Sequence, residues 1–174
     1  MKFLISIVLL FFNISYGMLL IKPEDAIKEQ FPDSKIVKKN ILLTKKQVSQ
    51  IQKLSKSRLN SSIITVYFIK KDGKNVGYGI INTHKVRTKK ETVLFILSPD
   101  CKIQDIEIIA FYEPPEYMPD KRWLKVFKGK DSSNQLRLKR DIPNITGATL
   151  SSKAITTATR QTVYICETVL KGKK

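Results

Sequence analysis

The sequence predicts an α+β domain: an antiparallel sheet of about four or more strands, packed by a long C-terminal helix, with a helical segment at the N-terminus. Hydrophobic residues alternate through 62–113, a helical periodicity fills the last third of the chain, and shorter helical patterns follow an apolar leader. A chain of 174 residues suits one globular domain of ordinary size.

The first seventeen residues predict a secretory signal peptide over 1–17. One basic residue precedes an apolar run from Phe3 to Phe12, and the small residues Ser15 and Gly17 follow it where a signal peptidase cleaves. We therefore expect an exported protein of the periplasm or cell envelope. The apolar run is shorter than the roughly 20 residues of a bilayer span, but residues 19–21 extend it, so an uncleaved N-terminal anchor stays open.

The chain is strongly basic, with 32 Lys and Arg against 15 Asp and Glu and a net charge of +17. These charges spread over nearly every segment and form no single stripe, and no nucleic-acid motif accompanies them. Nucleic acid is therefore excluded as the expected partner, and an anionic membrane surface or anionic partner is favoured.

Two cysteines, Cys101 and Cys166, are too few for a disulfide framework. Cys101 follows a turn signal and Cys166 lies in the apolar pattern of the last helix, so the sequence leaves open whether they pair. One histidine and two separated cysteines make no metal site, and no Ser-His-acid motif is present. We accordingly name no catalytic residue.

Residues 18–60 are predicted as an N-terminal helical extension. It contains a helix over 22–32 with Pro23 in its first turn, a strand over 36–43, and an amphipathic helix over 44–59 that opens on a capping box of Thr44 and Gln47.

Residues 61–174 are predicted as the main domain. Its first half reads as two hairpins, 62–84 around Asp72-Gly73 and 92–113 around Pro99 to Cys101. Pro114 and Pro115 then end the sheet, and a short helix follows with Trp123 facing inward. A loop leads to a final helix from about Ser151 to Lys171, which we expect to cover one face of the sheet.

The loop before the last helix, TGATLSS over 146–152, has the chemistry of an anion site. Gly147 permits a tight backbone path, and the helix N-terminus offers unpaired N–H groups at the positive end of a dipole. Hydroxyls on Thr146, Thr149 and the two serines can donate to phosphate or form an ester with it. The ordinary alternative is that Ser151 or Ser152 simply caps the helix.

The motif Thr146-Gly147-Ala148-Thr149, followed by Leu150 and Ser151, resembles the covalent flavin attachment motif of the bacterial FMN-binding domain family. The family includes flavin subunits of sodium-pumping NADH:quinone oxidoreductases and related electron-transport complexes. The resemblance covers about residues 62–168 and includes further short stretches in the family's order: Tyr78-Gly79, Pro99 to Lys102, Glu113, Phe127 to Lys130, and Asp141-Ile142.

The resemblance implies that FMN is joined by a phosphoester bond to Thr149, with Thr146, Gly147, Ala148, Leu150 and Ser151 at the phosphate end. It implies a flavin transferase as the maturation partner and redox proteins of the cell envelope as the electron partners. The family has an Asp three residues before the motif, whereas this chain has Pro143. Attachment through Thr149 or non-covalent binding of FMN therefore both stay open, with Asp141 as a candidate substitute.

An isoalloxazine ring needs an apolar platform. The candidates for stacking are Tyr78, Tyr112, Tyr117 and Trp123, and Glu113 either contacts the flavin or ends a strand in solvent. His84, within a lysine-rich segment, is expected on the surface.

We thus interpret the sequence as an exported FMN-binding electron-transfer protein, a carrier rather than an enzyme. Two alternatives stay open: a flavin-dependent reductase acting on a small acceptor, and a basic, cofactor-free binding protein of the cell envelope.

Overall fold

The computed structural model describes residues 18–172, so the predicted signal peptide lies outside the described residues. In chain order the elements are β1 (Met18–Leu19), α1 (Pro23–Gln30), β2 (Lys35–Leu42), α2 (Lys45–Ser55), β3 (Ile63–Lys71), β4 (Lys74–Lys85), β5 (Lys90–Leu97), β6 (Ile103–Phe111), η1 (Pro115–Tyr117), α3 (Lys121–Leu124), η2 (Lys125–Phe127), α4 (Thr149–Ile165) and η3 (Cys166–Leu170). Of these, η1 and η2 are 3₁₀ turns, and η3 continues α4 as a π-helical turn.

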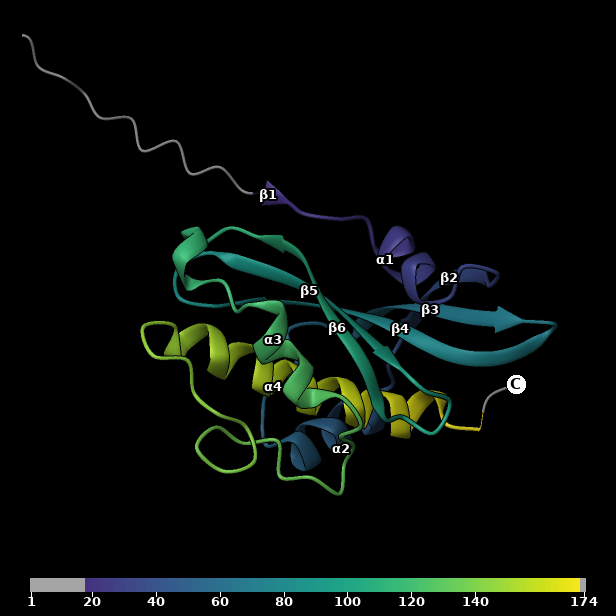
Figure 1. Ribbon diagram of the computed structural model, residues 1–174. Helices are drawn as coiled ribbons and strands as arrows, with labels where there is room; N and C mark the ends of the chain where they lie inside the picture. Colours follow the sequence, from purple (N-terminus) through teal and green to yellow (C-terminus); the bar gives the residue numbers. More distant parts are fainter. Residues whose placement is uncertain (1–17, 173–174) are drawn as a thin grey trace, which may run out of the picture.

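The strands form one antiparallel sheet of six in the order β1-β6-β5-β4-β3-β2. From β2 to β6 neighbours in the sheet are neighbours in sequence, whereas β1 pairs with β6 at the opposite edge from β2. The segment that carries α1 therefore runs from one edge of the sheet to the other (Figure 1).

The fold-class prediction is confirmed: a long C-terminal helix packs on an antiparallel sheet, and the helix α1 lies near the N-terminus, between β1 and β2. Both predicted hairpins and the capping box of Thr44 and Gln47 are present. The strand predicted over 36–43 joins the same sheet, since β2 pairs with β3 along its whole length. The domain boundary at residue 60 stays a prediction.

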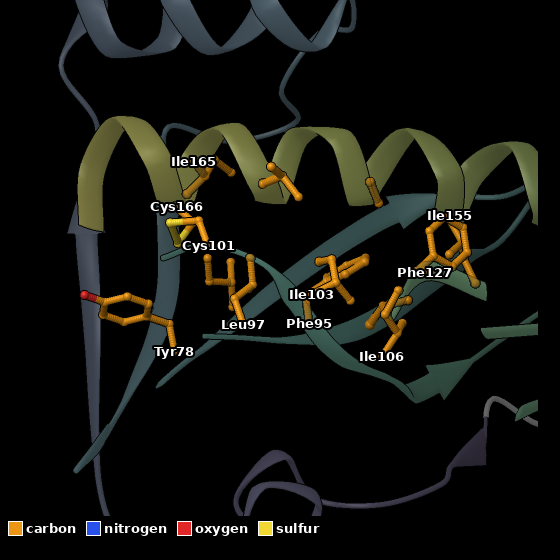
Figure 2. Packing of buried hydrophobic residues seen from close by; sticks show 14 of the residues in the cluster. Tyr78, Phe95, Leu97, Cys101, Ile103, Ile106, Phe127, Ile155, Ile165 and Cys166 are labelled. Carbon is orange, nitrogen blue, oxygen red and sulfur yellow. A yellow bond between two sulfur atoms is a disulfide. The ribbon is translucent and has the colours of Figure 1, made fainter. Parts of the chain in front are cut away.

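The two faces of the sheet are covered unequally. Helix α1 lies on one face, and α2, α3 and α4 lie on the other (Figure 1). The larger hydrophobic core lies under α4, where Ile155 lies beside Phe127, Ile165 lies beside the Cys101–Cys166 disulfide, and Phe95 and Ile103 lie between them (Figure 2). Burial of this apolar surface is the main force that fixes α4 on the sheet.

Gly79 on β4 makes room for α1 on the other face. A Cβ atom there would lie 3.0 Å from Cδ1 of Ile27 and 3.1 Å from Cδ1 of Leu94. Ile27 is fully buried. Even a methyl group at position 79 would require these side chains to shift by a few tenths of an ångström, so a larger residue there would disturb the packing of α1 on the sheet.

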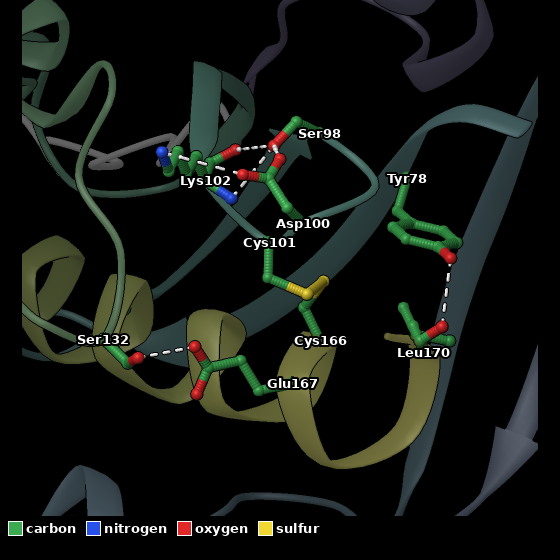
Figure 3. Close-up of a disulfide and its surroundings, with 9 residues drawn as sticks. All are labelled: Tyr78, Ser98, Asp100, Cys101, Lys102, Ser132, Cys166, Glu167 and Leu170. Carbon is green, nitrogen blue, oxygen red and sulfur yellow. Dashed lines mark hydrogen bonds and ion pairs between the residues drawn. A yellow bond between two sulfur atoms is a disulfide. The ribbon is translucent and has the colours of Figure 1, made fainter. Parts of the chain in front are cut away.

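A disulfide joins Cys101 to Cys166, which answers the question that the sequence left open. It connects the β5–β6 turn to the end of α4 (Figure 3). Next to it, the Tyr78 hydroxyl donates to the Leu170 carbonyl at 3.0 Å, so the C-terminal end of the helix is held both covalently and by a hydrogen bond.

Among the described residues, no helix is both long and apolar enough to cross a membrane.

Removal of the disulfide through the double variant Cys101→Ala/Cys166→Ala should lower the free energy of unfolding by about 4 kcal/mol, because the bond closes a loop of 65 residues in the unfolded chain. Urea denaturation of both proteins, with and without reductant, measures the loss. Reductant should destabilise only the wild type. Equal urea midpoints for the variant and the oxidised wild type would contradict the expected contribution.

Candidate FMN site

The last helix begins two residues earlier than predicted, at Thr149, with Ala148 as the N-cap. Ser151 and Ser152 are buried inside the first turns, and neither caps the helix, so the capping alternative is wrong. Instead, the Ser152 hydroxyl donates to the Ala148 carbonyl at 2.8 Å and accepts from the Ile145 amide at 3.3 Å. Ser152 thereby ties the loop to the helix that follows it.

No side chain caps this helix start. The amides of its first turn therefore lack the acceptor that a capping residue supplies, and they carry the positive end of the helix dipole. Gly147, directly before the cap, has φ +84°, a left-handed conformation that glycine adopts without strain. An uncapped helix start behind a glycine turn is suited to an anion.

The loop is also held from its other side. Trp123 donates its indole N–H to the Pro143 carbonyl at 2.9 Å while its ring packs edge-on against Phe127. Asn144 donates its side-chain amide to the Thr149 hydroxyl at 3.0 Å. Trp123 is only 8% exposed. Its contacts position the loop, and it does not line the pocket described below.

Glu113 organises the turn between β4 and β5. One carboxylate oxygen accepts from the backbone amides of Arg87, Thr88 and Lys89 at 3.0, 2.6 and 2.7 Å. Burial alone would raise the pKa of the Glu113 carboxyl, but the amides of Lys89, Thr88 and Arg87 together hold that pKa below its ordinary value. Glu113 is therefore an ionised anchor for the turn, and it is buried rather than solvated at a strand end.

The glycine turn, the helix start and the β4–β5 turn together enclose a cavity of about 280 Å³. It is lined by Val86, Arg87, Glu113, Tyr117 and the five residues from Gly147 to Ser151. One wall is thus an uncapped helix start, another includes the cationic residue Arg87, and Val86, Tyr117 and Leu150 are apolar.

The structure gathers most, but not all, of the predicted site residues. Gly147, Ala148, Thr149, Leu150, Ser151 and Glu113 line this cavity, and Thr146 directly precedes them.

Of the four aromatic candidates, Tyr117 lines the cavity. Tyr112 lines a separate groove beside Lys85 and Lys90. Tyr78 is buried at the opposite end of α4, hydrogen bonded to Leu170, so the structure does not bring it to the cavity.

The expectation of a surface histidine is wrong. His84 lies on β4 with 8% of its surface exposed, and its Nε2 is 3.0 Å from Oε2 of the fully buried Glu91. His84 and Glu91 lie opposite each other on the paired strands β4 and β5. Nδ1 of His84 lies 3.1 Å from Oδ1 of Asn82. The Asn82 side-chain amide in turn donates a hydrogen bond to Oε1 of Gln161 on α4. Burial raises the pKa of Glu91, and His84 opposes that rise.

Residues 87–164 match the family model of the FMN-binding domain. The family predicted from the sequence is therefore confirmed for this part of the chain, which runs from the β4–β5 turn to the last turn of α4. The match indicates FMN as the cofactor, against the cofactor-free alternative. Neither the curated proteins nor the solved structures compared with the chain gave a match.

The residues of the cavity fit FMN at its phosphate end. The uncapped helix start and Arg87 supply N–H donors and positive charge for a phosphate. The left-handed turn at Gly147 leaves open space beside the helix start, because a Cβ there would meet no atom within 4 Å. The apolar walls at Val86, Tyr117 and Leu150 suit a flavin ring.

Two contributors were missed from the sequence, Val86 and Arg87. The sequence shows them only as part of a lysine-rich turn, and their place in the cavity depends on Glu113 of a later segment. The available signal was Glu113, an acid two residues after the end of β6 and just before Pro114 and Pro115.

Glu113 should make the domain sensitive to acid. Because the pKa of its carboxyl is lowered on folding, the stability that it contributes is present above its ordinary value of 4.5 and is lost as pH falls through the folded value. Glu113→Gln should lower the free energy of unfolding by about 2 kcal/mol at pH 7 and flatten its decline at acid pH.

Thermal unfolding from pH 7 down to pH 3 measures this effect, with the exposed Glu116→Gln as the matched control. Parallel pH profiles of Glu113→Gln and the wild type would contradict the assigned role of Glu113.

Proposed function

We propose that this protein is an exported electron-transfer protein whose FMN is joined by a phosphoester bond to the Thr149 hydroxyl. The observation that carries the proposal is the position of Thr149. It is the first residue of α4, within the FMN-binding match, on the wall of a cavity suited to a phosphate.

The surroundings of Thr149 support attachment. Its side chain is exposed, and its oxygen accepts from the Asn144 amide, which leaves the hydroxyl proton free to depart when the ester forms. Leu150 beside it is 49% exposed, so the motif is open to a transferase. The phosphoester would keep a negative charge, which the helix dipole stabilises.

The missing motif acid bears on this step. Asp141 accepts from the amides of Leu136 and Arg137 at 2.9 and 2.8 Å, so its carboxylate is committed to the preceding loop. The Pro143 carbonyl accepts a hydrogen bond from the indole N–H of Trp123. We infer that attachment at Thr149 proceeds without a carboxylate in the motif position.

A carrier role is supported by the small volume of the cavity, which would leave part of a bound flavin uncovered. FMN supplies reversible transfer of one or two electrons when bound, and a cavity of about 280 Å³ is at the small end for a ligand of this size. Val86, Tyr117 and Leu150 would hold one side of the ring, and the other side would face redox partners.

The disulfide supports export, because such bonds persist in oxidising compartments. Because the protein has a net charge of +17, we also propose that its partners and the membrane surfaces it meets are anionic.

Co-expression with a flavin transferase in the periplasm tests the attachment. Intact mass should show the protein plus FMN less water, and the purified protein should be yellow. Thr149→Val should abolish the adduct because it removes the ester oxygen and keeps the shape of the side chain.

Thr146→Val is the matched control, since Thr146 is also exposed in the same motif and should keep the adduct. An unchanged adduct in Thr149→Val, or none in the wild type, would overturn covalent attachment at this residue.

A further inference from the structure

A second cavity, of about 410 Å³, lies between the end of α2, the long loop before α4 and the middle of α4. It shares no lining residue with the FMN cavity. Four of its lining residues are cationic: Lys56, Arg137, Arg140 and Arg160. No acidic residue lines it.

Arg160 is the fixed element of this cavity. Its guanidinium is half-buried, and it donates from Nε to the Ser55 carbonyl at 3.0 Å and from Nη1 to the Leu136 carbonyl at 2.7 Å. Both bonds are to neutral groups, and no ion pair within residues 18–172 includes an arginine. A partly buried charge without a directly paired counter-ion is costly.

The nearby acids are committed elsewhere. Asp141 is the carboxylate that acts on Arg160 electrostatically, but its oxygens accept the backbone amides of Leu136 and Arg137. Glu167 accepts from Ser132 (Figure 3). Burial and then the charge of Arg137 lower the pKa of Arg160, while Tyr164 and Asp141 oppose that shift, so an anion bound beside Arg160 and Arg137 would offset the repulsion between these two arginines.

We propose that this cavity binds a phosphate group. Hydrogen bonds to two carbonyls orient the Arg160 guanidinium and leave its remaining N–H donors available. Arg137 and Arg140, in the adjoining loop, add two more guanidinium groups that can bind phosphate oxygens. Neutral donors from Asn134 and Gln135 complete the wall.

A phosphate is favoured over a carboxylate because the cavity concentrates four cations. A phosphate monoester carries up to two negative charges and offers three terminal oxygens, so it can serve several guanidinium groups at once. A single carboxylate has two oxygens and one charge.

Calorimetric titration of the purified protein with inorganic phosphate at low ionic strength tests the proposal. The double variant Arg137→Ala/Arg140→Ala removes two exposed side chains from the cavity and keeps Arg160 in place. It should bind phosphate at least about tenfold more weakly than the wild type, the loss expected from removing a hydrogen bond to a charged group.

Arg122→Ala/Lys125→Ala is the matched control, because it removes the same charge from exposed positions outside the cavity. A second arm measures co-sedimentation of the same proteins with phosphatidylglycerol-containing vesicles, against vesicles of phosphatidylcholine alone. Selective loss in the calorimetric arm identifies a soluble phosphate as the ligand, and selective loss in the vesicle arm alone identifies a lipid headgroup.

Equal effects of the two double variants in both arms, or no binding by the wild type in either, would overturn the proposal. Phosphate bound only in the FMN cavity would leave both double variants like the wild type, so this outcome also counts against it. The result is independent of whether Thr149 carries FMN.

Discussion

The packing of α4 on the sheet positions the larger core, the disulfide and the candidate FMN site. Its buried side, from Ile155 to Ile165, meets the central strands and forms most of the larger core. A disulfide and the Tyr78 hydroxyl hold its C-terminal end, and hydrogen bonds through Ser152 and Trp123 hold the loop at its N-terminal end. The helix is thus fixed at both ends, and its first turn can stay uncapped without fraying.

That uncapped turn links fold to function. A capped helix would satisfy its own first amides, whereas this one presents them to a cavity beside Arg87. Glu113 supplies the opposite wall because it gathers three amides of the β4–β5 turn. The proposed anion binding at this site rests on backbone groups that the fold holds in place, with Thr149 as the first residue of the helix.

Local patterns predicted much of this fold, because the signals of hairpins and caps lie within a few residues of one another. Asp72-Gly73 indicated its turn, and TGATLSS indicated an anion site before the helix. Contacts between distant segments were out of reach. The burial of His84 depends on Glu91 across a strand pair, and the disulfide depends on where α4 ends. The alternation of hydrophobic residues around Tyr78 does not predict which end of α4 its side chain contacts.

We expect FMN to meet the chain at the start of α4. Titration of ¹⁵N-labelled protein with FMN, followed by two-dimensional NMR, locates the contact residue by residue. The largest amide shifts should fall on Gly147 to Ser151 and on Arg87 to Lys89, with little change near Leu170. Shifts centred on Tyr78 and Leu170, or no shifts at the helix start, would contradict it.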